Sequence, residues 1–226
     1  KAHVYKFSDD EFKGRKAGDA GHNKASNFLK NYYIQENIGS PFDGDNYYQK
    51  IPEPFLPKGT KATQNVIAYI KGREKPDEVL IISGHSDHEG FTSTGIYNGA
   101  DDNGSGTAAI MEIAQAFKIA EKNGISPKRS IVFLHLTAEE IGLIGSTYYT
   151  KHPVFGLNKT IANLNIDMIG RIDEKHKDNP NYIYIIGADR LSQELHFISE
   201  AANRNFTKLD LDYTYNAEDD KNRYYF

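Results

Sequence analysis

The chain has 226 residues, which is enough for one large α/β domain or two small ones. Hydrophobic residues make up 38% and charged residues 26%, as in a globular protein, and a formal net charge of −4 without a basic block argues against nucleic acid as a partner. The sequence contains no cysteine, which excludes disulfides and thiolate chemistry, so His, Asp and Glu would have to hold any metal.

The first half of the chain predicts helices and strands in alternation. Helical spacing in 22–33 (HNKASNFLKNYY) is followed by a connection rich in proline at 51–59 (IPEPFLPKG). Residues 65–70 (NVIAYI) and 79–83 (VLIIS) are typical of strands. A long helix is predicted over 105–124, beginning at Ser105 and ending at Gly124, with its apolar residues on one face.

The second half continues the alternation. Apolar runs predict strands at 130–136, 160–170 and 182–187, and helices are predicted at 144–150 and 191–202. Strands that alternate with helices favour a mostly parallel sheet covered on both faces. The expected fold class is therefore α/β, a three-layer α/β/α sandwich with a mostly parallel central sheet.

Acidic and imidazole side chains follow the ends of the predicted strands. Gly84-His85-Ser86-Asp87 comes after one strand, Glu139 and Glu140 come after another, and Asp167 ends a third. The loop that leads into the long helix is 100–106 (ADDNGSG). Ligands bind beyond the carboxyl ends of strands in such sheets, so we expect these groups to gather at one edge.

A cluster of this many carboxylates is costly unless cations neutralise it. One histidine with several carboxylates suits zinc, or harder ions such as manganese and cobalt, and several anionic ligands favour two ions over one. Each motif alone also has an ordinary explanation, such as a surface pair, a helix N-cap turn or the exposed first turn of a helix. Their joint occurrence at strand ends favours the metal site.

Four motifs, GHSD, NGADDNGSG, LTAEEIGLIGS and NIDMIG, together resemble the M28 family of metallopeptidases, zinc aminopeptidases with a phosphorylase/hydrolase-like α/β/α fold. The segment SDDEFKGRKAGDAGHNKASNFL also resembles the opening helix and loop of bacterial members, so the resemblance runs from near Phe7 to about Gly170. It implies an aminopeptidase that acts on peptide substrates and binds zinc, as two ions, with cobalt or manganese as substitutes.

The resemblance also implies a role for each metal-binding residue. His85 and Asp167 would ligate the first metal, Glu140 the second, and Asp102 would bridge both ions. Family members often have a cis peptide bond after the bridging aspartate, which predicts one between Asp102 and Asn103.

Two further residues receive catalytic roles by the same resemblance. Glu139 would be the general base that takes a proton from a metal-bridging water before this water attacks the scissile carbonyl. Asp87 would orient the imidazole of His85. His88, Glu89 and Tyr97 are adjacent candidates for lining the substrate site.

The sequence departs from the family pattern at one ligand. The fifth family ligand is a downstream histidine, typically in a Ser-Asp-His stretch, and no such stretch occurs before the end of the chain at 216–226 (NAEDDKNRYYF). His88 lies too close to His85 to take that place in the motif. We therefore expect residues 1–226 to form a single catalytic domain that lacks its C-terminal part and is inactive or weakly active by itself.

Two other functions stay open. One is a glutaminyl-cyclase-like transferase with one zinc ion, and the other is a non-catalytic binding module on the same fold. The two-metal peptidase is preferred because the motifs around Asp102 and Glu140 match it and no predicted base or ligand up to Asp167 is missing. We expect a secreted, periplasmic or cell-envelope location, without nucleic acid or a membrane span. Residue preference and oligomeric state are not predicted.

Overall fold

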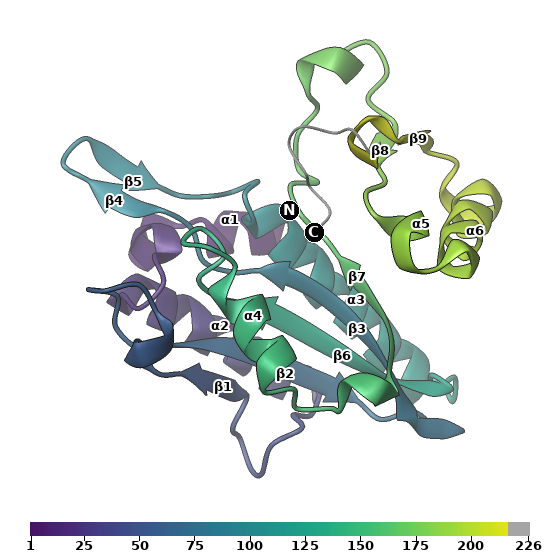
Figure 1. Ribbon diagram of the computed structural model, residues 1–226, viewed down its shortest axis with the longest axis horizontal. Coiled ribbons are helices and arrows are strands. Elements are labelled where there is room, and N and C mark those ends of the chain that lie inside the picture. The colour runs from purple at the N-terminus through teal and green to yellow at the C-terminus, as the bar shows by residue number, and fades with distance from the viewer. Residues whose placement is uncertain (217–226) are drawn as a thin grey trace. The chain divides into compact units, whose positions relative to one another are not determined.

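The computed structural model describes residues 1–216, and the chain forms two compact units, Lys1–Gly170 (unit 1) and Arg171 onward (unit 2). Figure 1 shows that unit 1 contains the large sheet and that unit 2 is made of short helices and strands. No described helix has both the length and the apolar character needed to cross a membrane. The expectation of a single catalytic domain over 1–226 stays a prediction.

Unit 1 is built on a five-stranded sheet in the order β1-β2-β6-β3-β7. Its strands are β1 (Tyr48–Ile51), β2 (Thr63–Ile70), β3 (Lys75–His85), β6 (Arg129–Leu136) and β7 (Thr160–Asn165). The strand β2 is antiparallel to both neighbours, whereas β6, β3 and β7 are mutually parallel, so all strands except β2 point the same way. The mostly parallel sheet is confirmed.

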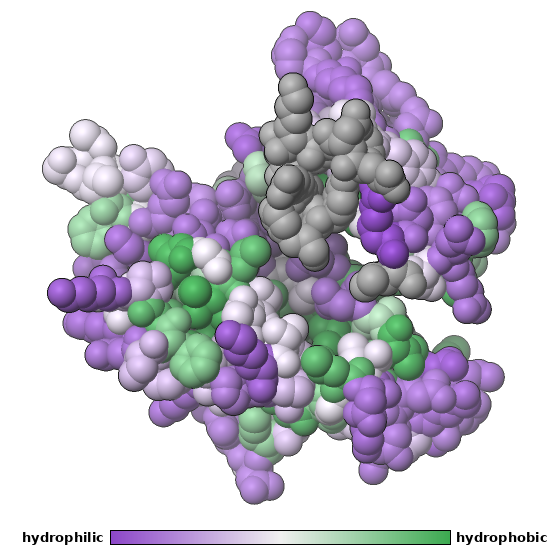
Figure 2. All heavy atoms as spheres, viewed as in Figure 1, coloured by the Kyte–Doolittle hydropathy of each residue, from purple (hydrophilic) through white to green (hydrophobic). Residues whose placement is uncertain are grey.

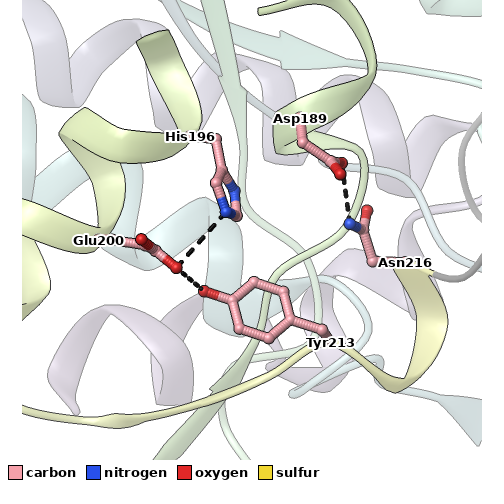
Figure 3. Close-up of a pocket in the computed structure, with 5 residues that line it drawn as sticks. All are labelled: Asp189, His196, Glu200, Tyr213 and Asn216. Atoms are coloured by element: carbon pink, nitrogen blue, oxygen red, sulfur yellow. Dashed lines mark hydrogen bonds and ion pairs between the residues drawn. The ribbon is translucent and has the colours of Figure 1, made fainter. Parts of the chain in front are cut away.

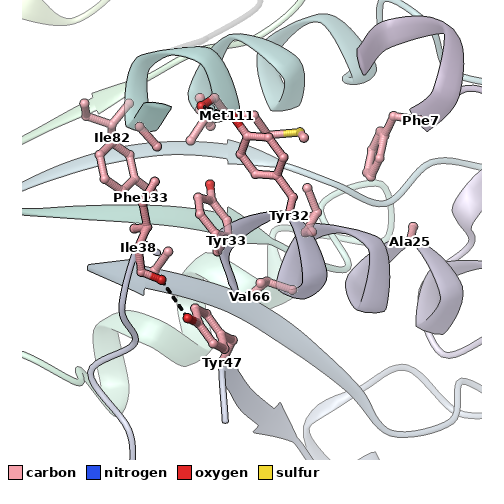
Figure 4. Close-up of a cluster of buried hydrophobic side chains, with 14 of the residues drawn as sticks. Phe7, Ala25, Tyr32, Tyr33, Ile38, Tyr47, Val66, Ile82, Met111 and Phe133 are labelled. Carbon is pink, nitrogen blue, oxygen red and sulfur yellow. Dashed lines mark hydrogen bonds between the residues drawn. The ribbon is translucent and has the colours of Figure 1, made fainter. Parts of the chain in front are cut away.

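One face of this sheet is covered by α1 (Ala2–Phe7), α2 (Ala20–Gln35) and α3 (Gly104–Lys122). Aliphatic and aromatic residues make this contact, and Tyr33 of α2 is fully buried against Phe133 of β6 (Figure 4). The hydroxyl of Tyr47 donates to the main-chain oxygen of Ile38 at 2.6 Å, which satisfies a polar group inside the core.

The opposite face is covered by α4 (Ile144–Lys151). Tyr149 of α4 packs on Ile67, Val132 and Leu134, which alternate along their strands with the residues that face the other layer. Because both faces are covered, β2 and β6 contain continuous apolar runs at 66–68 and 131–134. The three-layer α/β/α sandwich is confirmed.

Two predicted strands differ from the observed ones. The strand predicted over 160–170 ends at Asn165, because the amides of Met168 and Ile169 bond to the side chains of Asn103 and Ser105 instead of a neighbouring strand. The segment 182–187 forms only β8 (Tyr182–Tyr184), which pairs with β9 (Asp210–Asp212) in a separate two-stranded sheet.

The predicted helices are present with shifted ends. Asn103, not Ser105, caps α3, since its side chain accepts from the Gly106 amide. The helix predicted over 191–202 is two helices, α5 (Ala188–Leu191) and α6 (Gln193–Ala202), because Ser192 between them is extended and caps α6. The hairpin of β4 (Gly90–Thr92) and β5 (Gly95–Tyr97), which was not predicted, projects from unit 1 (Figure 1).

Figure 2 shows one face, on which hydrophobic side chains gather in patches that are surrounded by polar ones. Short 3₁₀ or π segments complete the described chain, at Asp10–Arg15, Glu53–Phe55, Leu157–Lys159, Glu174–His176, Asn203–Thr207 and Thr214–Asn216.

Candidate metal centre

The strand register brings the predicted site residues of unit 1 together. The parallel pairing of β3 with β6 sets His85 opposite Leu136, so the chain that leaves β6 passes beside the imidazole. The amide of Ile166 donates to the Ser83 carbonyl on the other side of β3, which places Asp167 next to the same strand end. The expected gathering at one edge of the sheet is observed.

His85 lies at the centre of the first group. Its Nε2 atom is 3.0 Å from Oδ1 of Asp102 and 3.5 Å from Oδ1 of Asp167, and its side chain is only 3% exposed. Thr107 of α3 donates a hydrogen bond to the His85 carbonyl and fixes the main chain behind the ring. One nitrogen and two carboxylates therefore converge on a single point.

The opposite ring nitrogen of His85 faces Asp87. Nδ1 is 3.2 Å from the Asp87 carbonyl oxygen and 3.8 Å from its carboxylate, so the nearer partner is the main chain. The Asp87 carboxylate, which is 1% exposed, accepts from the Glu139 amide at 3.1 Å. Asp87 thus contacts both the ring of His85 and the main chain of Glu139.

The donor chemistry and spacing of the His85 group fit a zinc ion. Zinc binds histidine nitrogen and carboxylate oxygen at about 2.0–2.2 Å in tetrahedral geometry, so two ligand atoms of one ion lie about 3.3 Å apart. The two distances from His85 Nε2 to the carboxylates bracket this value. Burial opposes protonation of His85, but the carboxylates of Asp102, Asp167 and Asp87 raise its pKa to about 12, which shows how strongly they attract a positive charge.

The loop from Asp102 into α3 is held tightly. The predicted cis peptide bond between Asp102 and Asn103 is present. Asn103 is fully buried, and its amide nitrogen donates to the Ile166 carbonyl while its oxygen caps the helix at Gly106. A Cβ at Gly106 would lie 2.3 Å from the Asn103 oxygen, so this contact requires glycine.

The pair Glu139 and Glu140 follows β6 in a turn that starts with Ala138 at a left-handed φ of 55°. Burial raises the pKa of Glu139, and the nearby carboxylates of Glu140, Asp87 and Asp167 raise it further against the opposing effect of His85. A raised pKa suits a group that must accept a proton near neutral pH.

Glu140 belongs to another group, with Asp102 and His88. The Oε1 atom of Glu140 is 2.6 Å from Nδ1 of His88. Sequence reasoning treated His88 only as a residue that lines the site, because its spacing from His85 does not match the family's ligand motif. Among the described histidines, only His85 and His88 belong to groups that could hold a metal.

Arg15 is a supporting residue that sequence reasoning missed. Its side chain is fully buried and donates to the main-chain oxygens of Ser86, Asn98 and Gly99, and of Phe7 at the end of α1. Burial lowers the pKa of Arg15 to about 10, although Asp87, Asp102 and Glu140 favour its charged form. The guanidinium therefore ties together the loops that present His85 and Asp102.

Unit 2 contains a pocket of about 350 Å³ that includes none of the predicted site residues (Figure 3). His196 and Tyr213 both contact Glu200 there, and Asn216 donates to Asp189. These contacts pair the polar groups with each other and gather no group that could hold a metal within residues 171–216.

The model of the family described as peptidase family M28 matches residues 65–223. The chain belongs to peptidase family M28. A curated M28-like relative, the probable glutamate carboxypeptidase LAMP1 of Arabidopsis thaliana, is 41% identical over 105 residues, which is 46% of this chain and 14% of that protein. This chain thus spans much less than two thirds of that relative's length.

Solved structures support the fold of this M28 chain. BSAP, a zinc aminopeptidase from Bacillus subtilis, has a TM-score of 0.67 at 15% identity, covering 93% of this chain and 78% of that one. A glutaminyl cyclase from Bacteroides thetaiotaomicron, bound to N-acetylhistamine, has a TM-score of 0.69 at 16% identity, covering 93% and 73%. At such identities the likeness establishes the architecture alone.

Proposed function

We propose that this M28 chain carries the catalytic centre of a zinc-dependent aminopeptidase that removes N-terminal residues from peptides. One observation carries the proposal. The carboxylates of Asp102 and Asp167 both lie within 3.5 Å of Nε2 of His85, next to the half-buried Glu139. Membership of the M28 family supports a peptidase. An aminopeptidase and a glutaminyl cyclase share this fold, so substrate assays distinguish the two reactions.

The proposed metal ligands are divided between two ions. His85 and Asp167 would hold the first ion, Glu140 would hold the second, and Asp102 would contribute to both, with cobalt or manganese as substitutes for zinc. When bound, the metal polarises the scissile carbonyl and lowers the pKa of water. Holding two cations also relieves the repulsion among the carboxylates that converge here.

Glu139 is the proposed general base. As a carboxylate it accepts a proton from the attacking water, and as the acid formed in that step it returns the proton to the leaving amine. The hydrogen bond from its amide to Asp87 fixes the main chain of this residue beside His85. Burial raises the pKa of Glu139, which makes the carboxylate a better proton acceptor than an exposed glutamate.

A free α-amine on the substrate needs a carboxylate that the metals leave available. Glu89 is exposed and belongs to none of the groups that could hold a metal, so its charge can attract an ammonium group. Arg15, beneath these loops, is fully buried with its donors on main-chain oxygens, so it is not available to a substrate carboxylate. Glu89 and Tyr97, near the β4–β5 hairpin, are the proposed lining residues.

Hydrolysis of aminoacyl-p-nitroanilides by the zinc-loaded full-length protein tests this proposal. We expect turnover that is lost on chelation and is restored by zinc, cobalt or manganese. Blocking the substrate α-amine with an acetyl group should abolish turnover, because Glu89 then has no ammonium group to bind. Peptides with C-terminal glutamate and peptides with N-terminal glutamine, followed by mass spectrometry, serve as the matched alternatives.

The outcomes separate the competing functions. Release of C-terminal glutamate would identify a carboxypeptidase, and loss of ammonia from N-terminal glutamine with one bound zinc would identify a cyclase. Zinc binding without turnover of any of these substrates would favour a binding module. Each of these three results would contradict the assignment of this protein as an aminopeptidase.

A further inference from the structure

The ring of His88 is held between two parts of the candidate metal centre. Its Nδ1 atom is 2.6 Å from Oε1 of Glu140, and the side chains of His88 and Glu140 are 13% and 20% exposed. A Cβ at Gly99 would lie 2.6 Å from the ring carbon Cγ, and Gly99 has a left-handed φ of 57°. The His88 amide donates to the Arg15 carbonyl, so the main chain at this position is also fixed.

The distance from His88 to Glu140 distinguishes a hydrogen bond from two ligands of one ion. Two atoms bound to the same tetrahedral zinc lie about 3.3 Å apart, as the contacts of His85 nearly do. The 2.6 Å between His88 and Glu140 is well below that separation. It matches a short hydrogen bond between a ring N–H and a carboxylate.

We propose that His88 is a positioning residue for the metal ligand Glu140. Its Nδ1–H donates to Oε1 and holds the carboxylate, so that the second oxygen is free to bind the ion shared with Asp102. Hydrogen bonds of this kind orient metal-binding carboxylates, and their loss typically costs 10–100-fold in metal affinity. The proposal rests on the metal centre of the proposed function and adds a residue to it.

Substitution of His88 tests the hydrogen bond directly. An asparagine places its amide nitrogen near the position of Nδ1 and can still donate to Glu140, whereas a glutamine places it near Nε2, and alanine removes the donor. We expect His88→Ala and His88→Gln to weaken binding of the second zinc about 10–100-fold. His88→Asn should recover most of the wild-type affinity.

The readout is the number of zinc ions retained per chain at graded chelator concentrations, with the absorption of bound cobalt as a second measure. Circular dichroism verifies that each variant is folded. His152→Ala is the matched control, because it removes an exposed histidine that belongs to none of the candidate metal groups. Its zinc binding should equal that of the wild type.

Three results would overturn the proposal. Wild-type affinity in His88→Ala would show that Glu140 needs no positioning partner, and equal losses in His88→Asn and His88→Ala would show that His88 binds the metal itself. If the wild-type protein binds no zinc, both this proposal and the proposed function are wrong. If it binds zinc but has no peptidase activity, only the proposed function is wrong.

Discussion

The two units of this protein each contain a cluster of histidine and carboxylate side chains, and the clusters differ in charge balance. In unit 1, His85 and His88 face the carboxylates of Asp102, Glu140 and Asp167. In unit 2, His176 contacts both Asp173 and Asp212, and Lys175 places a cation against Asp212.

The difference shows which cluster needs a metal. In unit 2, burial opposes ionisation of Asp212, but Lys175 and Thr214 lower its pKa to about 2, so the carboxylate is stable as an anion among its own partners. In unit 1, burial raises the pKa of Glu139 and the nearby carboxylates raise it further, while the buried Arg15 donates to main-chain oxygens instead of these carboxylates. A histidine beside acidic groups is therefore a sign of a metal only where no protein cation balances them.

The largest expected effect is a loss of activity, and it distinguishes the roles of Glu139 and Glu140 in unit 1. Glu139→Gln should keep its zinc and lose about 10²–10⁴-fold in kcat, since a general base contributes that much to rate. Glu140→Gln should instead lower zinc content, because it removes a charged ligand from the group with Asp102. Steady-state kinetics and elemental analysis measure the two effects, and similar activity and zinc content in both variants would contradict the assignment.

The sequence predicted which side chains gather at the candidate site wherever a chemically active residue follows a strand end. His85, Glu139 and Asp167 each come shortly after an apolar run, and the parallel sheet brings such positions together. Arg15 could not be found in this way, because its contact with Ser86 joins residues 71 positions apart. A charged side chain in a polar N-terminal stretch carries no local sign that it will be buried.

The strands of the sheet could likewise be predicted in part. Long buried strands such as β3 and β6 have continuous apolar runs, whereas β4 and β5 have three residues each and no such pattern. The pattern in 182–187 identified a strand but could not identify its partner, which is β9 and not the large sheet. Periodicity reports what a segment buries, and pairing depends on contacts distant in sequence.

A second prediction concerns His135, which is fully buried in unit 1 without a carboxylate partner. Burial lowers the pKa of His135 to about 3. Below about pH 6.5 the unfolded state therefore binds a proton at His135, whereas the folded state keeps the imidazole neutral. The stability of the folded state should therefore fall by about 1.4 kcal/mol per pH unit as the pH drops from about 6.5.

His135→Gln isolates this effect, because glutamine keeps an acceptor for the Tyr33 hydroxyl and cannot titrate. Between pH 6.5 and 5 the wild type should lose about 2 kcal/mol more unfolding free energy than the variant. Denaturant unfolding followed by circular dichroism at both pH values measures the difference. His22, whose pKa burial lowers to about 4, contributes equally to both proteins. Equal pH dependence of the two would show that His135 is charged in the folded state.

The smallest expected effect tests the balanced cluster of unit 2. Asp212→Asn keeps the shape of the side chain but removes the charge that faces Lys175 and His176, and we expect a loss of only about 1 kcal/mol in unfolding free energy. Because Asp212 has a depressed pKa, its contribution is present above about pH 4 and is lost as the pH falls toward about 2, where wild type and variant should become equally stable. Zinc content and kcat should not change, since this charge is balanced within unit 2. A loss of zinc as large as that of Glu140→Gln would break the comparison and make the second cluster part of the metal centre.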